Sequence, residues 1–263
     1  GRDFGVIISC LNTMGYIVEW RVVNAADYGF PQRRRRTFIF ASKTGLLLSN
    51  YYKESLPQAV LLRDGFFART FEVISGTDLY SIQIPQNLVT LTNEFKTYFG
   101  NAGYSINHVC HSMELTPKHN LYSSTLGDIL EKDVDEKYFI KEQDLDKSKY
   151  MKGSKSEIRK TKEGYEYHYT EGAIPYPEPL DRPSRTMLTS ESSKNRSTHV
   201  VFDPHTNRLR LLTPVECERL DGFPDNWTNT GMPQKFRYFC MGNALVVGVI
   251  EMIGKKLIEI IES

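Results

Sequence analysis

Three side chains near the start of the chain are spaced to act together on a polar ligand: Gln32, Arg34 and Arg36. In an extended segment, alternate residues point the same way, so these three share one face while Arg33 and Arg35 point away. A fixed guanidinium donates hydrogen bonds in a planar fork that suits a carbonyl edge or a phosphate and that lysine cannot reproduce. Four consecutive arginines also occur on solvated surfaces and in general phosphate-binding patches, and the pattern alone leaves these two interpretations open.

The elements around the arginine run must position it. Residues 4–14 carry apolar side chains at helical spacing, and Gly15 follows them, so a helix is predicted to end there. Residues 16–23 and 37–41 are rich in β-branched and aromatic side chains and are predicted to be strands. The arginines therefore belong to a loop, residues 24–36, between two strands.

Regular structure is predicted again near the C-terminus. Thr213, Pro214 and Glu216 have the spacing of a helix start, with a capping residue, a proline in the first turn and a capping-box glutamate. Residues 244–261 are apolar on most turns, which predicts a helix packed on a sheet. A Gly-Asn pair before an apolar segment is typical of a turn, which is the simplest interpretation of residues 242–243.

The middle of the chain has a weaker pattern. Between about residues 43 and 183, short strand-like pieces at 71–74 and 165–169 alternate with Gly, Ser, Asn and Lys. Residues 144–166 are polar and mainly basic, with tyrosines interleaved. An irregular, exposed module between two α/β ends is therefore predicted.

Composition sets the broad class. The chain has 263 residues, 40% hydrophobic and 25% charged, with a formal net charge of +1, which is typical of a globular protein of one or two domains. It contains no apolar run near the ~18 residues of a membrane span and no secretory pattern, so an intracellular protein without membrane contact is expected. Four cysteines without a CxxC pair and six histidines without a metal motif predict neither a zinc site nor a disulfide framework. The start at Gly1 rather than Met hints at a fragment.

Three segments, in this order, resemble the eighth, ninth and tenth motifs of the cytosine-5 DNA methyltransferases. They are Asn24-Ala-Ala-Asp-Tyr-Gly-Phe-Pro-Gln-Arg-Arg-Arg-Arg36, Arg210-Leu-Leu-Thr-Pro-Val-Glu-Cys217 and Gly242-Asn-Ala244. The resemblance implies an α/β fold: the C-terminal part of a Rossmann-like S-adenosylmethionine-dependent methyltransferase domain, with an inserted irregular, β-containing target-recognition domain. The implied boundaries are 1–42 for the end of the catalytic domain, 43–183 for the target-recognition domain and 184–263 for the return to the catalytic domain.

The resemblance also implies roles in catalysis and cofactor binding. Arg36 would contact a flipped cytosine, Arg34 would contact a nearby phosphate or the active-site network, and Gln32 would support them. Asn243 and Ala244 would border the S-adenosylmethionine pocket, with a backbone contact at Ala244, where many relatives have Ser.

Further roles are implied in structure and in DNA binding. Arg210, Glu216 and Arg219 would make the ionic contacts that organise the target-recognition domain against the catalytic domain. Duplex DNA is the expected partner, with basic side chains on phosphates and a few polar or aromatic ones on base edges. The expected DNA-facing residues are Lys147, Lys149, Lys152, Lys155, Arg159, Lys160, Lys162, Arg185 and Thr189.

Several family motifs are missing from the chain. It has no Pro-Cys-Gln nucleophile loop, no Phe-x-Gly-x-Gly cofactor loop and no Glu-Asn-Val motif, so its cofactor site is expected to be incomplete and the isolated chain inactive. A missing N-terminal half, in the same or a second chain, is expected as a partner. Two alternatives remain: a natural DNA-specificity subunit of a two-chain methyltransferase, and a catalytically dead DNA-binding module. An RNA-directed relative is less favoured, because so long a recognition region suggests duplex readout. A cytoplasmic protein of bacterial or phage restriction-modification is expected.

Overall fold

The computed structural model describes residues 1–45, 52–119 and 123–262, which form two compact units. The first unit contains Gly1–Gly29, Arg35–Tyr122 and Gly248–Ser263, and the second contains Phe30–Arg34 and Ser123–Val247. The chain therefore passes between the units more than once. The limits of the two units do not coincide with the predicted domain boundaries, which lie between residues 42 and 43 and between residues 183 and 184. The roles predicted for the domains stay predictions.

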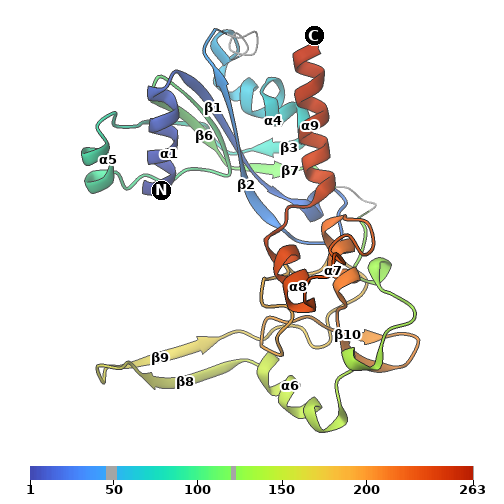
Figure 1. The fold of residues 1–263 in the computed structure, drawn as a ribbon. Coiled ribbons are helices and arrows are strands. Elements are labelled where there is room, and N and C mark those ends of the chain that lie inside the picture. The colour runs from blue at the N-terminus through green and yellow to red at the C-terminus, as the bar shows by residue number, and fades with distance from the viewer. Residues whose placement is uncertain (46–51, 120–122, 263) are drawn as a thin grey trace. The chain divides into compact units, whose positions relative to one another are not determined.

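The first unit begins with the predicted order of helix, strand, loop and strand (Figure 1). The elements are α1 (Arg2–Thr13), β1 (Tyr16–Asn24), the 3₁₀ turn η1 (Ala25–Tyr28) and β2 (Arg35–Lys43). Gly15 has φ +81°, a conformation that favours glycine and lets the chain reverse after the helix. β1 and β2 are antiparallel along their whole length, from Tyr16 opposite Lys43 to Asn24 opposite Arg35.

The sheet of this unit also recruits residues that the sequence analysis assigned to an irregular module. It has five strands in the order β2-β1-β5-β6-β4, and β3 pairs separately with β7. The remaining elements are α3 (Pro57–Ala59), the π-helical turn η2 (Val60–Asp64), α4 (Phe66–Thr70), β3 (Val73–Gly76), β4 (Tyr80–Gln83), α5 (Leu88–Glu94), β5 (Ala102–Ile106), β6 (Val109–Met113), β7 (Leu115–Pro117) and α9 (Val247–Glu262). Residues 52–117 therefore contain regular helices and strands where irregular structure was expected, while the predicted domain boundaries stay predictions. The pairing of β5 with β1 joins residues some 80 positions apart, which local patterns do not reveal.

Apolar side chains cover both faces of this sheet. On one face, the Trp20 ring lies edge-on to Phe4 (5.3 Å between centroids) and Phe99 (5.6 Å), and Gly103 allows the close approach, since a Cβ there would lie 2.1 Å from the indole. On the other face, the buried Glu19 carboxylate accepts hydrogen bonds from the backbone N–H groups of Phe66 (2.8 Å) and Phe67 (2.9 Å). This carboxylate fixes the start of α4 against β1.

The C-terminal helix α9 lies at the predicted position. It buries Val249 and leaves Ile250, Ile258 and Ile261 exposed. Met252, Ile253, Leu257 and Ile260 are half-buried along the other side of the helix, and its packing on a sheet stays a prediction.

The second unit combines short helices with two separate β-hairpins. Its elements are η3 (Gly127–Ile129), η4 (Glu136–Tyr138), η5 (Glu142–Asp144), α6 (Leu145–Lys152), β8 (Lys155–Lys160), β9 (Glu166–Glu171), β10 (Val200–Asp203), β11 (Arg208–Leu211), α7 (Pro214–Asp221) and α8 (Gln234–Asn243). Helix α7 has the predicted capping box between Thr213 and Glu216. Helix α8 was not predicted. Met187, Leu212, Leu220 and Met241 are among the core residues of this unit.

Two further features concern the whole described chain. All four cysteines are free, with Cys110 and Cys217 buried. Among the described residues, no helix is both long enough and apolar enough to cross a membrane.

Candidate functional site

Gln32 and Arg34 are buried structural residues of the second unit. The Arg34 guanidinium donates hydrogen bonds to the carbonyl oxygens of Met187 (3.2 Å) and Gly242 (2.8 Å), and its Nε lies 3.8 Å from the Asp221 carboxylate. The Gln32 amide oxygen accepts from Arg34 (3.0 Å) and from the backbone N–H of Met187 (3.0 Å). Arg34 is only 2% exposed. Gln32 and Arg34 therefore connect the arginine run to the backbone at Met187 and Gly242, and the predicted contact of Arg34 with a phosphate or the active-site network stays a prediction.

Arg36 is the accessible member of the predicted triplet. It lies on β2 in the first unit, opposite Val23, and its half-buried side chain donates a solvent-exposed hydrogen bond to the Arg35 carbonyl (2.8 Å). Arg33 and Arg35 are exposed, whereas Arg34 is buried, so side-chain burial alternates along the run as the sequence predicted. Arg36 therefore keeps guanidinium donors within reach of a ligand.

The ninth-motif residues Arg210 and Glu216 belong to one buried ion-pair network. The Arg210 guanidinium donates to Asp203 (2.7 Å) and, through both terminal nitrogens, to Glu216 (2.8 and 2.7 Å). Burial alone would lower the pKa of Arg210, but its hydrogen bonds to the two carboxylates raise the pKa above the ordinary value. Glu216 also accepts from the backbone N–H groups of Thr213 (2.8 Å) and Glu131 (2.9 Å). The network ties β10, β11, α7 and the segment at Glu131 together; the predicted role between two domains stays a prediction.

Arg219 makes a second connection on α7. It forms two hydrogen bonds to the Asp225 carboxylate (2.7 and 2.6 Å) and one to the Ile129 carbonyl (3.0 Å). The neighbouring Glu218 is buried and accepts from Arg237 (3.0 Å). No sequence motif indicated Glu218 or Arg237, because their meeting depends on the packing of α7 against α8.

The tenth-motif residues lie at the end of α8 rather than in the predicted turn. Asn243 is exposed and its amide donates to the Phe239 carbonyl (3.2 Å); Ala244 follows as the residue after the helix. Gly242 packs directly against the backbone at Thr189, since a Cβ on Gly242 would lie 2.3 Å from the Thr189 nitrogen. The contact of Asn243 and Ala244 with a cofactor stays a prediction.

Two of the residues predicted to face DNA are instead engaged inside the second unit. Lys152 is buried and donates to the carbonyl oxygens of Arg196 (2.6 Å) and Thr198, and burial lowers its pKa to about 8. Arg185 donates to the Glu178 carboxylate (2.6 Å) and also to the backbone at Ser197. These contacts fix residues 196–198. The buried Lys152 ammonium is committed to them, whereas Arg185 is partly exposed and its role in DNA binding stays a prediction.

The other predicted DNA-facing residues remain accessible. Arg159 is half-buried, with its guanidinium 3.5 Å from the centre of the Tyr169 ring. Thr189 is partly exposed beside Gly242. The exposed basic side chains of α6 and the β8–β9 hairpin are Lys147, Lys149, Lys160 and Lys162, and Lys155 is half-buried.

The structure also contains a buried Ser-His-Glu chain that no motif indicated. His199 lies between the Ser184 hydroxyl (3.0 Å from Nε2) and the Glu191 carboxylate (3.0 Å from Nδ1). Each of the three is at most 2% exposed, and the Ser184 hydroxyl donates to the Arg185 carbonyl (2.9 Å). A substrate cannot reach this serine, so the Ser184-His199-Glu191 hydrogen-bond network has a structural role.

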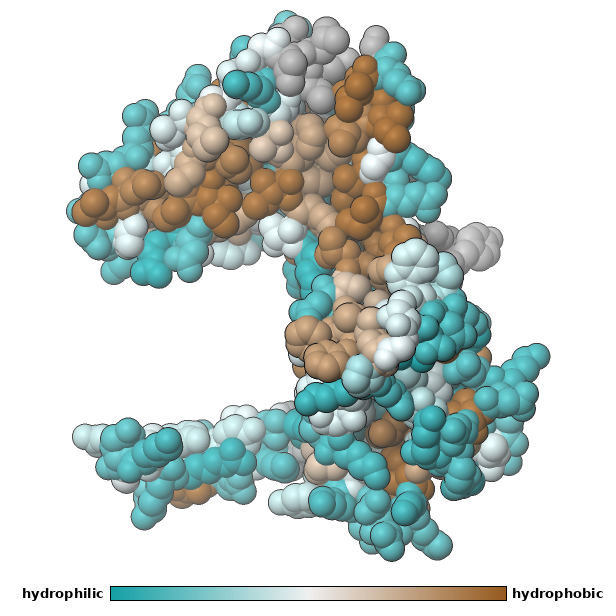
Figure 2. Space-filling model, viewed as in Figure 1, coloured by the Kyte–Doolittle hydropathy of each residue, from teal (hydrophilic) through white to brown (hydrophobic). Residues whose placement is uncertain are grey.

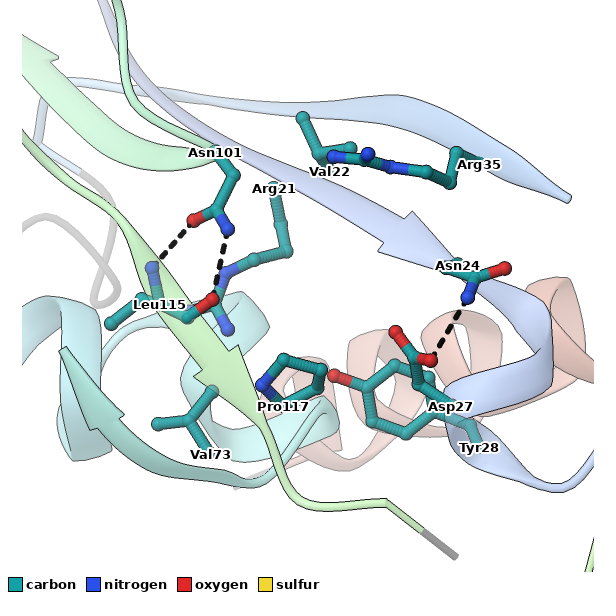
Figure 3. Close-up of a pocket in the computed structure, with 10 residues that line it drawn as sticks. All are labelled: Arg21, Val22, Asn24, Asp27, Tyr28, Arg35, Val73, Asn101, Leu115 and Pro117. Atoms are coloured by element: carbon teal, nitrogen blue, oxygen red, sulfur yellow. Dashed lines mark hydrogen bonds between the residues drawn. The ribbon is translucent and has the colours of Figure 1, made fainter. Parts of the chain in front are cut away.

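A cavity of about 180 Å³ lies in the first unit beside the loop that leads into the arginine run (Figure 3). Asn24, Asp27 and Tyr28 line one side, and Arg21 lines another. Arg21 donates to the Leu61 carbonyl (2.9 Å), but its Nε and Nη1, and the Asn24 amide oxygen, have no hydrogen-bond partner among the described residues. Burial lowers the pKa of Arg21. Ordered water is the usual partner of such groups.

Comparison with known protein families identifies the chain. The family model for C-5 cytosine-specific DNA methylases matches residues 1–259. The chain belongs to this family. Among related methylases, it is 46% identical to the type II methyltransferase M.Sau3AI of Staphylococcus aureus, over 99% of this chain and 63% of the relative. It is 24% identical to M.DsaV of Dactylococcopsis salina, over 100% of this chain and 53% of the relative. The chain thus spans between half and two thirds of these relatives.

Solved structures support the same type of fold. The chain matches the Entamoeba histolytica methyltransferase EhMeth with a TM-score of 0.52 and 16% identity, over 99% of this chain and 59% of that one. It matches a Spodoptera frugiperda DNMT2 mutant with a TM-score of 0.54 and 15% identity, over 98% and 62%. At these identities the matches concern the fold, and this methylase chain shares the mixed α/β fold of those proteins.

Proposed function

We propose that this chain is the C-terminal, DNA-recognising part of a cytosine-5 DNA methyltransferase and that it acts together with a segment that supplies the nucleophile and the cofactor loop. The match to the methylase family over residues 1–259 carries the proposal. Its support is the order of the three motifs, the missing Pro-Cys-Gln sequence, and the 63% of M.Sau3AI that the chain spans. The type II relatives support a setting in bacterial restriction-modification, in the cytoplasm.

In this reaction, a cysteine thiolate adds to C6 of a flipped cytosine, and C5 then becomes nucleophilic. Negative charge develops along the O2 and N3 edge of the base, and a fixed donor on that edge lowers the barrier. Arg36 supplies this donor, because its guanidinium is accessible on β2. Removing one such donor costs about 10²–10³ in rate in other enzymes.

The thiolate has to come from outside this chain. Burial raises the pKa of Cys110 to about 12 and holds the pKa of Cys217 well above its ordinary value. Both thiols therefore stay protonated near neutral pH and are poor nucleophiles. Cys10 and Cys240 lie in helices α1 and α8, and neither follows a proline.

S-adenosylmethionine supplies the methyl group in this family's reaction. On this chain, the exposed Asn243 amide carries both a donor and an acceptor, and the backbone at Ala244 leaves the helix there, which fits one edge of a polar cofactor site. Gly242 holds this end of α8 against Thr189, so it positions Asn243.

The proposal is tested by mixing the purified chain with a separately expressed segment that carries the Phe-x-Gly-x-Gly and Pro-Cys-Gln motifs. Transfer of labelled methyl groups from S-adenosylmethionine to duplex DNA is then measured. We expect activity only in the mixture, a loss of about 10²-fold or more with Arg36→Ala, and little change with the exposed neighbour Arg33→Ala. Sequence-specific DNA binding without activity in any mixture would instead indicate a binding module.

A further inference from the structure

The β8–β9 hairpin has two faces of different chemistry, and one of them suits the edges of DNA bases. We propose that this hairpin enters the major groove of the target duplex and that its open face selects the sequence. The open face consists of Ser156, Ile158, Lys160, Glu166, His168 and Thr170. The inference rests on the proposed function, and it assigns sequence choice to a particular set of side chains.

The register of the hairpin defines the two faces. β8 and β9 are antiparallel, with Ser156 opposite Thr170, Ile158 opposite His168 and Lys160 opposite Glu166. Side chains directly opposite each other in an antiparallel pair lie on the same face, and successive residues alternate. The residues between them, Lys155, Glu157, Arg159, Tyr167, Tyr169 and Glu171, therefore form the opposite face, here called the packed face.

The hairpin is a ribbon that projects from its own unit (Figure 1). Among the described residues, β8 and β9 pair only with each other, and residues 161–168 are all exposed. An isolated two-stranded hairpin is marginally stable in water, so a partner that orders it is expected. The major groove of DNA is about 12 Å wide and admits a two-stranded ribbon, and the family's substrate is DNA.

The packed face is already occupied by contacts within the protein. Arg159 stacks on Tyr169 (3.5 Å) and forms an ion pair with Glu157 (2.6 Å). Lys155 lies over the ring of Tyr150 on α6 (5.2 Å). Arg159, Glu157 and Tyr169 contact one another within the hairpin, and Lys155 contacts α6, so the packed face is less exposed than the open face.

The open face carries side chains that match base edges. Ile158 is 69% exposed and offers an apolar contact for a thymine methyl group. Lys160 can donate to guanine and Glu166 can accept from the amino group of cytosine. Their exposed ion pair (3.1 Å) is weak and easily exchanged for base contacts. Figure 2 shows the hairpin surface as mainly hydrophilic with a small hydrophobic patch.

The charges on the open face do not favour binding to phosphates. Lys160 and Glu166 cancel each other, so this face has little net attraction for phosphates. Exposed lysines flank it: Lys147 and Lys149 on α6 near the root, and Lys162 in the turn at the tip. We therefore assign phosphate binding to these lysines and base selection to the open face.

The test measures the sequence preference of the full chain. The chain is incubated with duplexes of randomised sequence, and bound duplexes are sequenced at two salt concentrations. The variants are Ile158→Ser and Glu166→Gln on the open face, Glu157→Gln on the packed face and Lys147→Gln on α6. We expect the open-face variants to lower the preference for the selected sequence by about tenfold or more at one or two positions. Glu157→Gln should leave the preference unchanged, and Lys147→Gln should weaken all duplexes alike with a salt slope smaller by ~0.9.

A preference that survives both open-face substitutions, in variants whose circular dichroism and urea midpoint match the unaltered chain, overturns the inference while leaving the proposed function intact. A change of preference with Glu157→Gln alone moves the selecting residues to the packed face and also overturns it. An unaltered chain without any sequence preference overturns both the inference and the proposed recognition role.

Discussion

Replacing Arg210 with methionine should destabilise the second unit strongly. The side chain is fully buried between Asp203 and Glu216, which are themselves at most 1% exposed. Methionine keeps much of the apolar stem but removes three charge-assisted hydrogen bonds of 2.7 to 2.8 Å. Two buried carboxylates are then left without their cation, a change that costs about 3–5 kcal/mol in other proteins.

The remaining contacts place the expected loss near the lower end of that range. Glu216 keeps the backbone N–H of Thr213 (2.8 Å), and Asp203 keeps those of His205 (3.0 Å) and Thr206 (2.9 Å). We therefore expect a loss of ~3 kcal/mol in the free energy of unfolding. Arg210→Lys should recover part of it, because lysine restores the charge but not the planar fork.

Urea unfolding followed by circular dichroism measures this loss, and Arg208→Gln is the matched control. Arg208 lies two residues away on the same strand and pairs with Glu136 (2.6 Å) in solvent, so its loss should be at most ~1 kcal/mol. A loss for Arg210→Met no larger than that of the control would refute the argument that buried charges dominate this network.

Three further predictions concern pH, lysine roles and backbone packing. Burial alone would raise the pKa values of Asp203 and Glu218, but their hydrogen bonds outweigh it and lower both pKa values below the ordinary 3.8 and 4.5. The two ionised carboxylates therefore stabilise the fold above those ordinary values, and this contribution is lost as they are protonated. Urea unfolding at a series of pH values should show the free energy of unfolding falling below about pH 4. Lys152→Met should cost ~1–3 kcal/mol in the free energy of unfolding, because the carbonyl oxygens of Arg196 and Thr198 lose their donor, and it should not change the salt dependence of DNA binding. Lys162→Gln should leave the free energy of unfolding unchanged and reduce the slope of the logarithm of DNA affinity against the logarithm of salt concentration by ~0.9. Gly242→Ala should cost ~1–3 kcal/mol in urea unfolding, since its Cβ overlaps the Thr189 backbone.

Local signals were sufficient for the elements next to the motifs. The apolar spacing before Gly15 predicted α1, and β1 and β2 were found where β-branched and aromatic residues gather. The Thr213 and Glu216 pair predicted the capping box of α7. These features depend on residues within a few positions of each other, and a single sequence contains that information.

Long-range packing produced the errors. β5 joins β1 across about 80 residues, so the local pattern around β5 predicts only irregular structure. Lys152 belongs to a basic run and looked like its neighbours, yet its side chain turns inward to the carbonyl oxygens of Arg196 and Thr198. The burial of Lys152 follows from its contact with residues 196–198, and the sequence around Lys152 alone does not reveal this contact.

The arginine run shows how one short pattern combines two physical tasks. Gln32 and Arg34 are buried. The Arg34 guanidinium donates to the carbonyl oxygens of Met187 and Gly242, and the Gln32 amide oxygen accepts from the Met187 N–H. A planar, always charged guanidinium suits this task, because it satisfies several carbonyl oxygens at once without losing its proton. Two residues later the same side-chain type, Arg36, is accessible on a strand. Arg34 and Arg36 are two residues apart, a spacing that in an extended segment puts both side chains on one side. However, Arg34 belongs to the second compact unit and Arg36 to the first, so their environments differ. The buried arginine is therefore expected to govern stability and the accessible one to govern catalysis, a division that unfolding and methyl-transfer measurements on Arg34→Met and Arg36→Ala can separate.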